Sequence, residues 1–357
     1  MSNYIEFNDK IAFHPGYYIK EIVDESGLTQ EDFAKRLGTT PKNLSILVRG
    51  EQSLSIDIAM KMSRMIGTSI EYWLNLQKAY DVLQAEYRSQ MEMEEERAVF
   101  SNLNYKYFRD NYRLPDLSGK RDEQIKTLRS FLNVATLSVL KKRDMSVNFR
   151  SSTGKIDENS IIKANTMVQI ATNDALKVKA PRYNKKKLES TVDYLLTLTD
   201  DKTSLFPKMK DSFLDAGIIL EIQPDIPGSR TNGATKKIGN NIMLMVNDRR
   251  LNADIFWFTL LHEVGHIMKG DFGISFEDES GEEEAAADKY ADERLIPKDQ
   301  YTMFIECEKY DLVSIRNFAN IIDRDPGIVL GRLQRDNKVR SDDAAMKSLR
   351  YKYKMLV

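Results

Sequence analysis

The strongest constraint on the fold is an apolar stretch, residues 254–267, that carries two histidines four positions apart. The sequence has three histidines in all, and His262 and His266 flank Glu263 in the order His-Glu-x-x-His. On a helix this spacing puts both imidazoles on one face, one turn apart, where they can share a metal ion. The motif also arises by chance, but buried imidazoles and a buried carboxylate are costly unless something satisfies them. The stretch therefore predicts a buried helix with a zinc site, because zinc accepts imidazole and carboxylate ligands.

A second helix is expected to supply the third protein ligand. Glu284 and Asp288 are one turn apart, so Glu284 can bind the metal while Asp288 orients a ligand imidazole. Glu282 and Glu283 are competing ligands, and all three glutamates are also compatible with a solvated helix start that favours negative charge. Small residues let this helix pack closely on the first, at Ala285, Ala286, Ala287 and Ala291. Gly265, between the histidines, indicates that a backbone or a metal-bound group lies close to it.

These residues resemble the ImmA/IrrE family of metallopeptidases, which have a gluzincin-like catalytic domain. The resemblance rests on Phe256–His266, on Glu284-x-x-Ala287-Asp288 and on Leu295-Ile296-Pro297. It implies a zinc-dependent endopeptidase that cleaves or regulates a DNA-binding repressor, with His262, His266 and Glu284 as metal ligands. Glu263 matches the catalytic glutamate, which takes a proton from the attacking water.

The N-terminal part of the chain carries a separate motif, two short helices joined by a glycine turn. Thr29 is a suitable N-cap, Gly38 ends the first helix, and Thr40-Pro41 starts the next. Residues 14–83 resemble the HigA-type branch of the Xre helix-turn-helix family, whose second helix enters the major groove of operator DNA. The resemblance and the local placement of basic residues give as candidate DNA contacts Gln30, Thr40, Lys42, Asn43, Ser45 and Arg49.

Composition limits the alternatives. A chain of 357 residues is long enough for two or three domains, and we expect residues 1–80 to bind DNA, 81–204 to form a helical connection and 205–357 to form the peptidase. The net charge of −1 gives no general attraction to nucleic acid or membranes. The polar N-terminus and the lack of long apolar runs predict a cytoplasmic protein without membrane segments. The single cysteine, Cys307, excludes an internal disulfide and is expected to be a small core residue.

The expected fold is mainly α with a small β-sheet (α+β). Residues 80–112 are predicted to form one long helix. Residues 217–222 and 241–246 are predicted strands, and a peptide substrate could pair with the edge of the second. Residues 228–235 are expected to form a plain surface loop rather than a mobile flap.

Two functions follow from these patterns. The first is a fused regulator that binds operator DNA and uses Zn²⁺ and Glu263 to cut a repressor, an antitoxin or itself. The second is a HigA-like antitoxin or repressor whose zinc domain senses or binds without turnover. Because helix-turn-helix proteins commonly bind paired half-sites, we expect a homodimer in either case.

Overall fold

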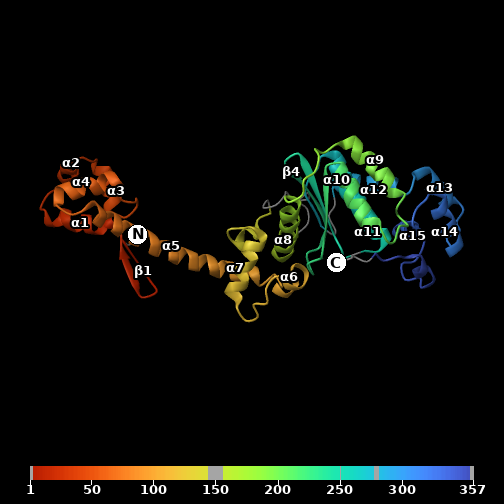
Figure 1. Cartoon of the computed structure of the whole chain (residues 1–357), viewed down its shortest axis with the longest axis horizontal. Coiled ribbons are helices and arrows are strands. Elements are labelled where there is room, and N and C mark those ends of the chain that lie inside the picture. The colour runs from red at the N-terminus through yellow and green to blue at the C-terminus, as the bar shows by residue number, and fades with distance from the viewer. Residues whose placement is uncertain (1–2, 144–155, 250, 277–280, 354–357) are drawn as a thin grey trace. The chain divides into compact units, whose positions relative to one another are not determined.

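The structure is a computed structural model that describes residues 3–143, 156–249, 251–276 and 281–353 (Figure 1). The described chain is mainly helical with small sheets, as the sequence predicted. It divides into two compact units, residues 1–95 and 96–357. This division differs from the three expected segments, because most of the expected connecting region packs within the second unit.

The N-terminal unit is a bundle of short helices preceded by a β-hairpin. The hairpin pairs β1 (Tyr4–Phe7) with β2 (Lys10–Phe13) in antiparallel register. The helices are α1 (Pro15–Glu25), α2 (Gln30–Leu37), α3 (Pro41–Val48), α4 (Ile56–Ile66) and the first part of α5 (Ile70–Phe100). Their core is formed by buried apolar residues, among them Phe33, Leu44, Leu47 and Trp73.

The predicted long helix over residues 80–112 is wrong at its C-terminal end. Helix α5 ends at Phe100, and a turn leads into α6 (Tyr105–Tyr112). Asn104 is the physical reason, because its side chain caps the new helix by accepting a hydrogen bond from the Lys106 backbone N–H at 3.0 Å.

The C-terminal unit begins with helices and continues with a sheet. The described helices before the sheet are α6, α7 (Arg121–Leu132), a 3₁₀ turn at Leu137–Lys141, α8 (Glu158–Ala175), α9 (Lys185–Leu196) and α10 (Leu205–Asp215). The strands are β3 (Ile218–Gln223), β4 (Thr231–Ile238), β5 (Asn241–Asn247) and β6 (Ile274–Phe276). Within the described residues they pair in the order β3-β5-β4-β6, with β3 parallel to β5 and the other pairs antiparallel.

The strands β3 and β5 confirm the two predicted strands, but two related expectations are wrong. Residues 228–235 are not a surface loop, since β4 starts at Thr231 and most of its first residues are buried. Strand β5 has no free edge for a peptide, because β3 and β4 flank it on both sides.

Alternate residues of β5 face opposite layers, as the two-residue period of a strand requires. Ile242, Leu244 and Val246 belong to the main core, which also contains Trp257 and Leu260 of α11 (Ala253–Lys269). Met243 points the other way and contacts Thr172 of α8 at 3.8 Å. The sheet therefore separates α8 from α11, and α11 is buried by the sheet on one side.

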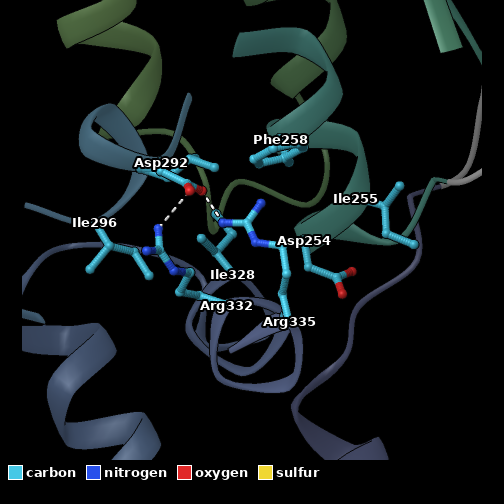
Figure 2. Close-up of a pocket in the computed structure, with 10 residues that line it drawn as sticks. Asp254, Ile255, Phe258, Asp292, Ile296, Ile328, Arg332 and Arg335 are labelled. Atoms are coloured by element: carbon cyan, nitrogen blue, oxygen red, sulfur yellow. Dashed lines mark hydrogen bonds and ion pairs between the residues drawn. The ribbon is translucent and has the colours of Figure 1, made fainter. Parts of the chain in front are cut away.

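Within the described residues, four helices follow β6. They are α12 (Glu282–Leu295), α13 (Lys298–Glu306), α14 (Leu312–Ile321) and α15 (Pro326–Arg335), followed by a 3₁₀ turn at Ala345–Leu349. Two of them, α12 and α15, pack on α11. Arg332 and Arg335 of α15 pair with Asp292 of α12 (Figure 2). Cys307, expected in the core, is exposed just after α13 instead.

Asp325, the N-cap of α15, should make the free energy of unfolding depend on pH. Asp325 is 1% exposed, and its carboxylate accepts a hydrogen bond from the Gly327 backbone N–H at 2.7 Å. Burial outweighs this hydrogen bond and raises the pKa of Asp325 to about 6. Because the folded-state pKa lies above the unfolded value, the folded state gains stability at low pH and loses it as the pH rises through 6.

Asp325→Asn, which cannot ionise, should therefore lose less stability than the wild type between pH 4.5 and 7.5, by roughly 2 kcal/mol. Calorimetric melting of both proteins at several pH values measures this difference. Asp311→Asn is the matched control, because hydrogen bonds at the exposed N-cap of α14 lower the pKa of Asp311, so this carboxyl is ionised over the whole range and its removal should leave the pH dependence as in the wild type. Parallel curves for wild type and Asp325→Asn would contradict the burial argument.

Candidate metal centre

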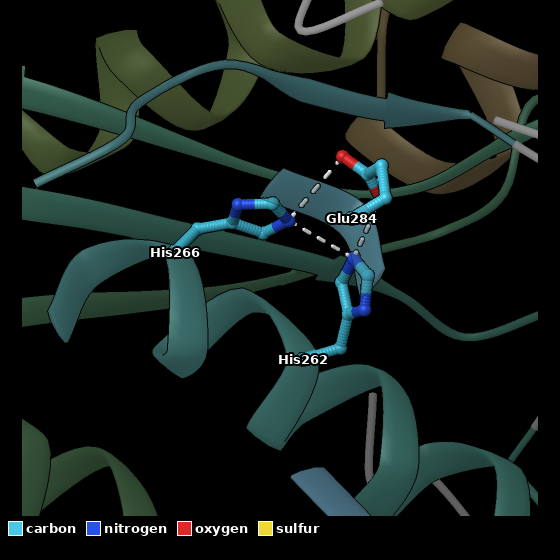
Figure 3. A group of neighbouring side chains, drawn as sticks. All are labelled: His262, His266 and Glu284. Atoms are coloured by element: carbon cyan, nitrogen blue, oxygen red, sulfur yellow. Dashed lines mark hydrogen bonds and ion pairs between the residues drawn. The ribbon is translucent and has the colours of Figure 1, made fainter. Parts of the chain in front are cut away.

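Three side chains from two helices converge in the C-terminal unit. His262 and His266 project from one face of α11, and Glu284 projects from the first turn of α12 (Figure 3). Their exposed fractions are 9%, 0% and 8%. One ligand atom from each lies within 4.8 Å of the others. The structure thus brings together the three residues that the sequence proposed as ligands.

The spacing of these atoms suits a zinc ion. The two Nε2 atoms are 3.1 Å apart, and Glu284 approaches Nε2 of His262 at 3.1 Å and Nε2 of His266 at 3.4 Å. Zinc–ligand bonds of about 2.0–2.1 Å in tetrahedral geometry place neighbouring ligand atoms roughly 3.3 Å apart. Two imidazole nitrogens and one carboxylate also leave a coordination position open.

The other ring nitrogen of each histidine is held by a carboxylate. Nδ1 of His262 is 2.8 Å from Asp288 of α12, as expected from the sequence. Nδ1 of His266 is 2.8 Å from Asp271, which the sequence reasoning missed. Such carboxylates fix the tautomer and orientation of a ligand imidazole, so both Nε2 atoms point at the same spot.

Asp271 reaches His266 because of how α11 ends. Gly270 takes a left-handed conformation with φ of 77°, and the Asp271 backbone N–H donates to the carbonyl of His266 at 3.0 Å. The turn folds the chain back toward the preceding helical turn. A carboxylate just after a C-terminal glycine, five residues beyond His266, is the signal in the sequence that could have identified this residue.

The acids and the imidazoles of the cluster shift one another's pKa values. Burial lowers the pKa of His262, but hydrogen bonds to Asp288 and Glu284 outweigh it and raise this pKa to about 10. Burial raises the pKa of Glu284, and the two histidines more than reverse this effect, so its pKa is lowered overall. The acids around the imidazoles therefore favour a positive charge at His262.

Glu263 lies beside the cluster and is fully buried. It packs against Gly233 of β4, where an added Cβ would lie 2.7 Å from Cγ of Glu263. The absence of a side chain at Gly233 therefore leaves room for the Glu263 side chain. Sequence reasoning missed this role of Gly233.

Close packing of α11 on α12 explains Gly265. A Cβ at Gly265 would lie 3.1 Å from Cα of Ala287, so the backbone of α12 occupies this space. Ala287 and Ala291 are fully buried, as their small size suggested, whereas Ala285 is exposed. Glu282 and Glu283, the competing ligands, are both exposed and lie outside the cluster.

The hydrogen bond to Asp271 leads to a prediction about metal affinity. Asp271→Asn removes the negative charge that orients His266, so zinc should bind about 10- to 100-fold more weakly. Competition with a chromophoric chelator measures the affinity. Asp299→Asn, an exposed acid on α13, is the control and should bind zinc as the wild type does. Equal affinities in the two variants would show that Asp271 does not support the site.

The N-terminal unit confirms the local helix-turn-helix geometry. Thr29 and Thr40 cap α2 and α3 through their side chains, and Gly38 ends α2 with φ of 67°. Leu44, Leu47 and Val48 are buried, as expected.

The candidate DNA contacts differ in how far their side chains are engaged within the protein. Asn43 donates to Thr39 and accepts from Gln52, and Arg49 donates to Ser45 and pairs with Glu51. The hydroxyl of Thr40 accepts from the Asn43 backbone N–H. Gln30 and Lys42 lie exposed at the first turns of α2 and α3.

Comparisons with known proteins match the N-terminal region. A helix-turn-helix family model matches residues 19–73. The chain is 38% identical over 79 residues to the uncharacterised HTH-type transcriptional regulator YddM of Escherichia coli, covering 22% of this chain and 84% of that protein. It is 29% identical to antitoxin HigA-1 of Vibrio cholerae, covering 23% of this chain and 78% of that protein. The N-terminal region therefore belongs to the helix-turn-helix family.

A solved structure gives a similar local match. An addiction module antidote protein of a HigA family from Coxiella burnetii is 30% identical, and the match covers 23% of this chain and 91% of that one at a TM-score of 0.22. Each of these matches covers less than a quarter of the chain. Among the described residues, no helix is both long and apolar enough to span a bilayer.

Proposed function

We propose that this chain is a DNA-binding regulator whose C-terminal unit is a zinc-dependent endopeptidase acting on a regulatory protein. The convergence of His262, His266 and Glu284 beside the buried Glu263 carries this proposal. A structural zinc site is normally closed by four protein ligands, whereas three ligands and a nearby carboxylate suit hydrolysis.

The residues of the site have two roles: some would bind the metal ion, and one would transfer a proton. When bound, zinc acts as a Lewis acid toward the peptide carbonyl and makes water easier to deprotonate. His262, His266 and Glu284 hold the ion, and Asp288 and Asp271 keep the imidazoles oriented. Glu263 takes up the proton of the attacking water and later gives it to the leaving amine.

A strand edge near this site could hold the peptide. Among the described strands, β3 and β6 lie at the edges of the sheet, and β6 follows α11 directly. We place the substrate along β6 rather than β5, because an extended peptide can add to a sheet only where backbone groups face outward.

The proposal is tested by incubating the zinc-loaded chain with a lysate of its own host cells and labelling new protein N-termini. We expect termini produced by the wild type and absent with Glu263→Gln. The same set of termini with both proteins would point to a contaminating peptidase.

The N-terminal unit is proposed to bind operator DNA through α3, as its family membership supports. Lys42 is exposed at the start of α3 and can pair with a phosphate. Lys42→Ala should weaken binding to a duplex of random sequence and reduce the slope of log affinity against log salt by about 1. Fluorescence anisotropy at several salt concentrations measures this slope, with Lys78→Ala on α5 as control. An unchanged slope would place Lys42 away from the phosphate backbone.

A second candidate is an antitoxin or repressor whose zinc domain only senses or binds. The likeness to antitoxin HigA-1 favours it for the N-terminal region. If the chain binds zinc but produces no new protein N-termini in the lysate, this second function is favoured. Under either function we expect a homodimer, which sedimentation at working concentration detects.

A further inference from the structure

The C-terminal unit contains an apolar cavity that the zinc site does not use. Its volume is 190 Å³, and it lies between the start of α11, the end of α12 and α15 (Figure 2). Its apolar walls are Ile255, Phe258, Leu295, Ile296 and Ile328. We call this cavity the apolar pocket.

The charged groups around the apolar pocket already pair with one another. Asp292 accepts from Arg332 at 2.9 Å and also pairs with Arg335, whose guanidinium lies 4.4 Å from the centre of the Phe258 ring. Asp254 pairs with Arg350 at 3.2 Å. A charged occupant would disturb these pairs without gaining a partner of its own, so the pocket favours an uncharged group.

The size of the pocket fits one large apolar side chain. An engineered apolar cavity of about 150 Å³ in another protein holds a benzene molecule, whereas pockets for drug-sized ligands occupy roughly 300–1,000 Å³. At 190 Å³ the apolar pocket matches a single aromatic or branched aliphatic group.

Two of the three helices that line the pocket, α11 and α12, also carry the proposed metal ligands. Phe258 precedes His262 by one helical turn, and their ring centres are 6.3 Å apart. Asp292 follows Asp288, the partner of His262, by one turn. A more open hollow of 380 Å³ includes Ala285 and Asp288 and shares Asp292, Ile296 and Arg332 with the pocket. The pocket and the hollow therefore have the Asp292–Arg332 ion pair in common, and the hollow extends along α12 as far as Asp288.

We propose that the apolar pocket receives an aromatic or branched aliphatic side chain of the protein substrate, and so helps to select where that protein is cut. This inference rests on the proposed peptidase function. Ile255 and His262 are separated along α11 by about 10 Å at 1.5 Å per residue. Since an extended peptide spans about 3.3 Å per residue, the anchored side chain lies on the order of three residues from the bond that is cut.

The first test measures binding of a small probe to the apolar pocket and does not depend on catalysis. Methyl groups of isoleucine are labelled with ¹³C in the zinc-loaded chain, and N-acetyl-phenylalaninamide is added as the probe. We expect shifts of the Ile255, Ile296 and Ile328 signals that N-acetyl-glycinamide does not produce. Ile255→Trp, which fills the pocket, should abolish the shifts at the two remaining isoleucines. The matched control Ile305→Trp, at another half-buried position on α13, should retain them.

The second test measures the effect on cleavage. Around a site identified by terminal labelling, each residue within four positions is changed in turn to Ala or Phe in synthetic peptides. Because burying a large apolar side chain contributes about 1.5–3 kcal/mol, one position should show a 10- to 100-fold preference for Phe in kcat/KM. Ile255→Trp should reduce this preference to about threefold or less while zinc content stays equal to that of Ile305→Trp.

The outcomes separate the two proposals. Cleavage that is indifferent to these substitutions, with no methyl shifts, would overturn the pocket assignment and leave the peptidase intact. Methyl shifts without cleavage of any protein would overturn the peptidase and, with it, the assignment of the occupant as a substrate side chain.

Discussion

Replacing Glu284 with alanine is expected to weaken zinc binding by more than about 100-fold, since even the groups that only orient a ligand contribute 10- to 100-fold. Glu284 is the carboxylate that approaches both Nε2 atoms, so its loss leaves two imidazoles to hold the ion. Zinc content after dialysis against a weak chelator measures the effect. Activity should fall in parallel, because the Lewis acid is lost with the ion.

Glu283→Ala is the control for this substitution. Glu283 is the adjacent residue in the same helical turn, but its side chain is exposed and outside the cluster. It should retain zinc at the wild-type level. Similar losses in the two variants would mean that the first turn of α12 contributes only general negative charge, the alternative that the sequence left open.

Glu263→Gln is expected to keep zinc and to lower kcat by about 10²- to 10⁴-fold, the range over which a positioned general base contributes. The amide has nearly the same shape as the carboxylate but cannot take up a proton from water. Single-turnover cleavage of an identified substrate measures the loss. Full activity in this variant would remove Glu263 from the mechanism.

Gly233→Ala tests the position of the Glu263 side chain without changing Glu263 itself. Its new Cβ must displace the Glu263 side chain, which would otherwise lie 2.7 Å away. Because misplacement by about 1 Å can reduce rates on the order of 100-fold, we expect slower cleavage with unchanged zinc content. A loss of zinc here would instead indicate that β4 supports the metal ligands.

Local signals in the sequence predicted the parts of the structure that depend on neighbouring residues. Threonine caps and glycine ends located α2 and α3 to within a residue or two. Helical spacing brought His262, His266, Glu284 and Asp288 together because both helices are regular and pack through small residues.

Features that depend on distant contacts were not predicted. Residues 228–235 contain Asn232-Gly233, which suggested a turn, but residues from Thr231 onward form a strand because β5 and β6 pair with them. Cys307 follows the last turn of α13, and nothing in its neighbourhood of the sequence shows that this end faces solvent. Asp271 was missed although its signal is local: the glycine turn at the end of α11 folds it back onto His266.

The DNA-binding part and the peptidase part of the proposed function are supported by different observations. The N-terminal region has relatives and a family model, so its helix-turn-helix class is established. The proposed function of the C-terminal unit is supported by geometry alone. Two helices bring three ligand atoms together, and two carboxylates hold the histidine rings in orientation. A regulator built this way would couple removal of a protein to control of a gene.

The zinc dependence of cleavage decides whether the C-terminal unit is a metallopeptidase. The purified wild-type chain is assayed for zinc content and for new protein N-termini before chelation, after chelation and after zinc is restored. A zinc peptidase should contain about one zinc per chain, stop cleaving when the metal is removed and recover with stoichiometric zinc. Cleavage that continues in the metal-free chain would show that the C-terminal unit does not depend on zinc.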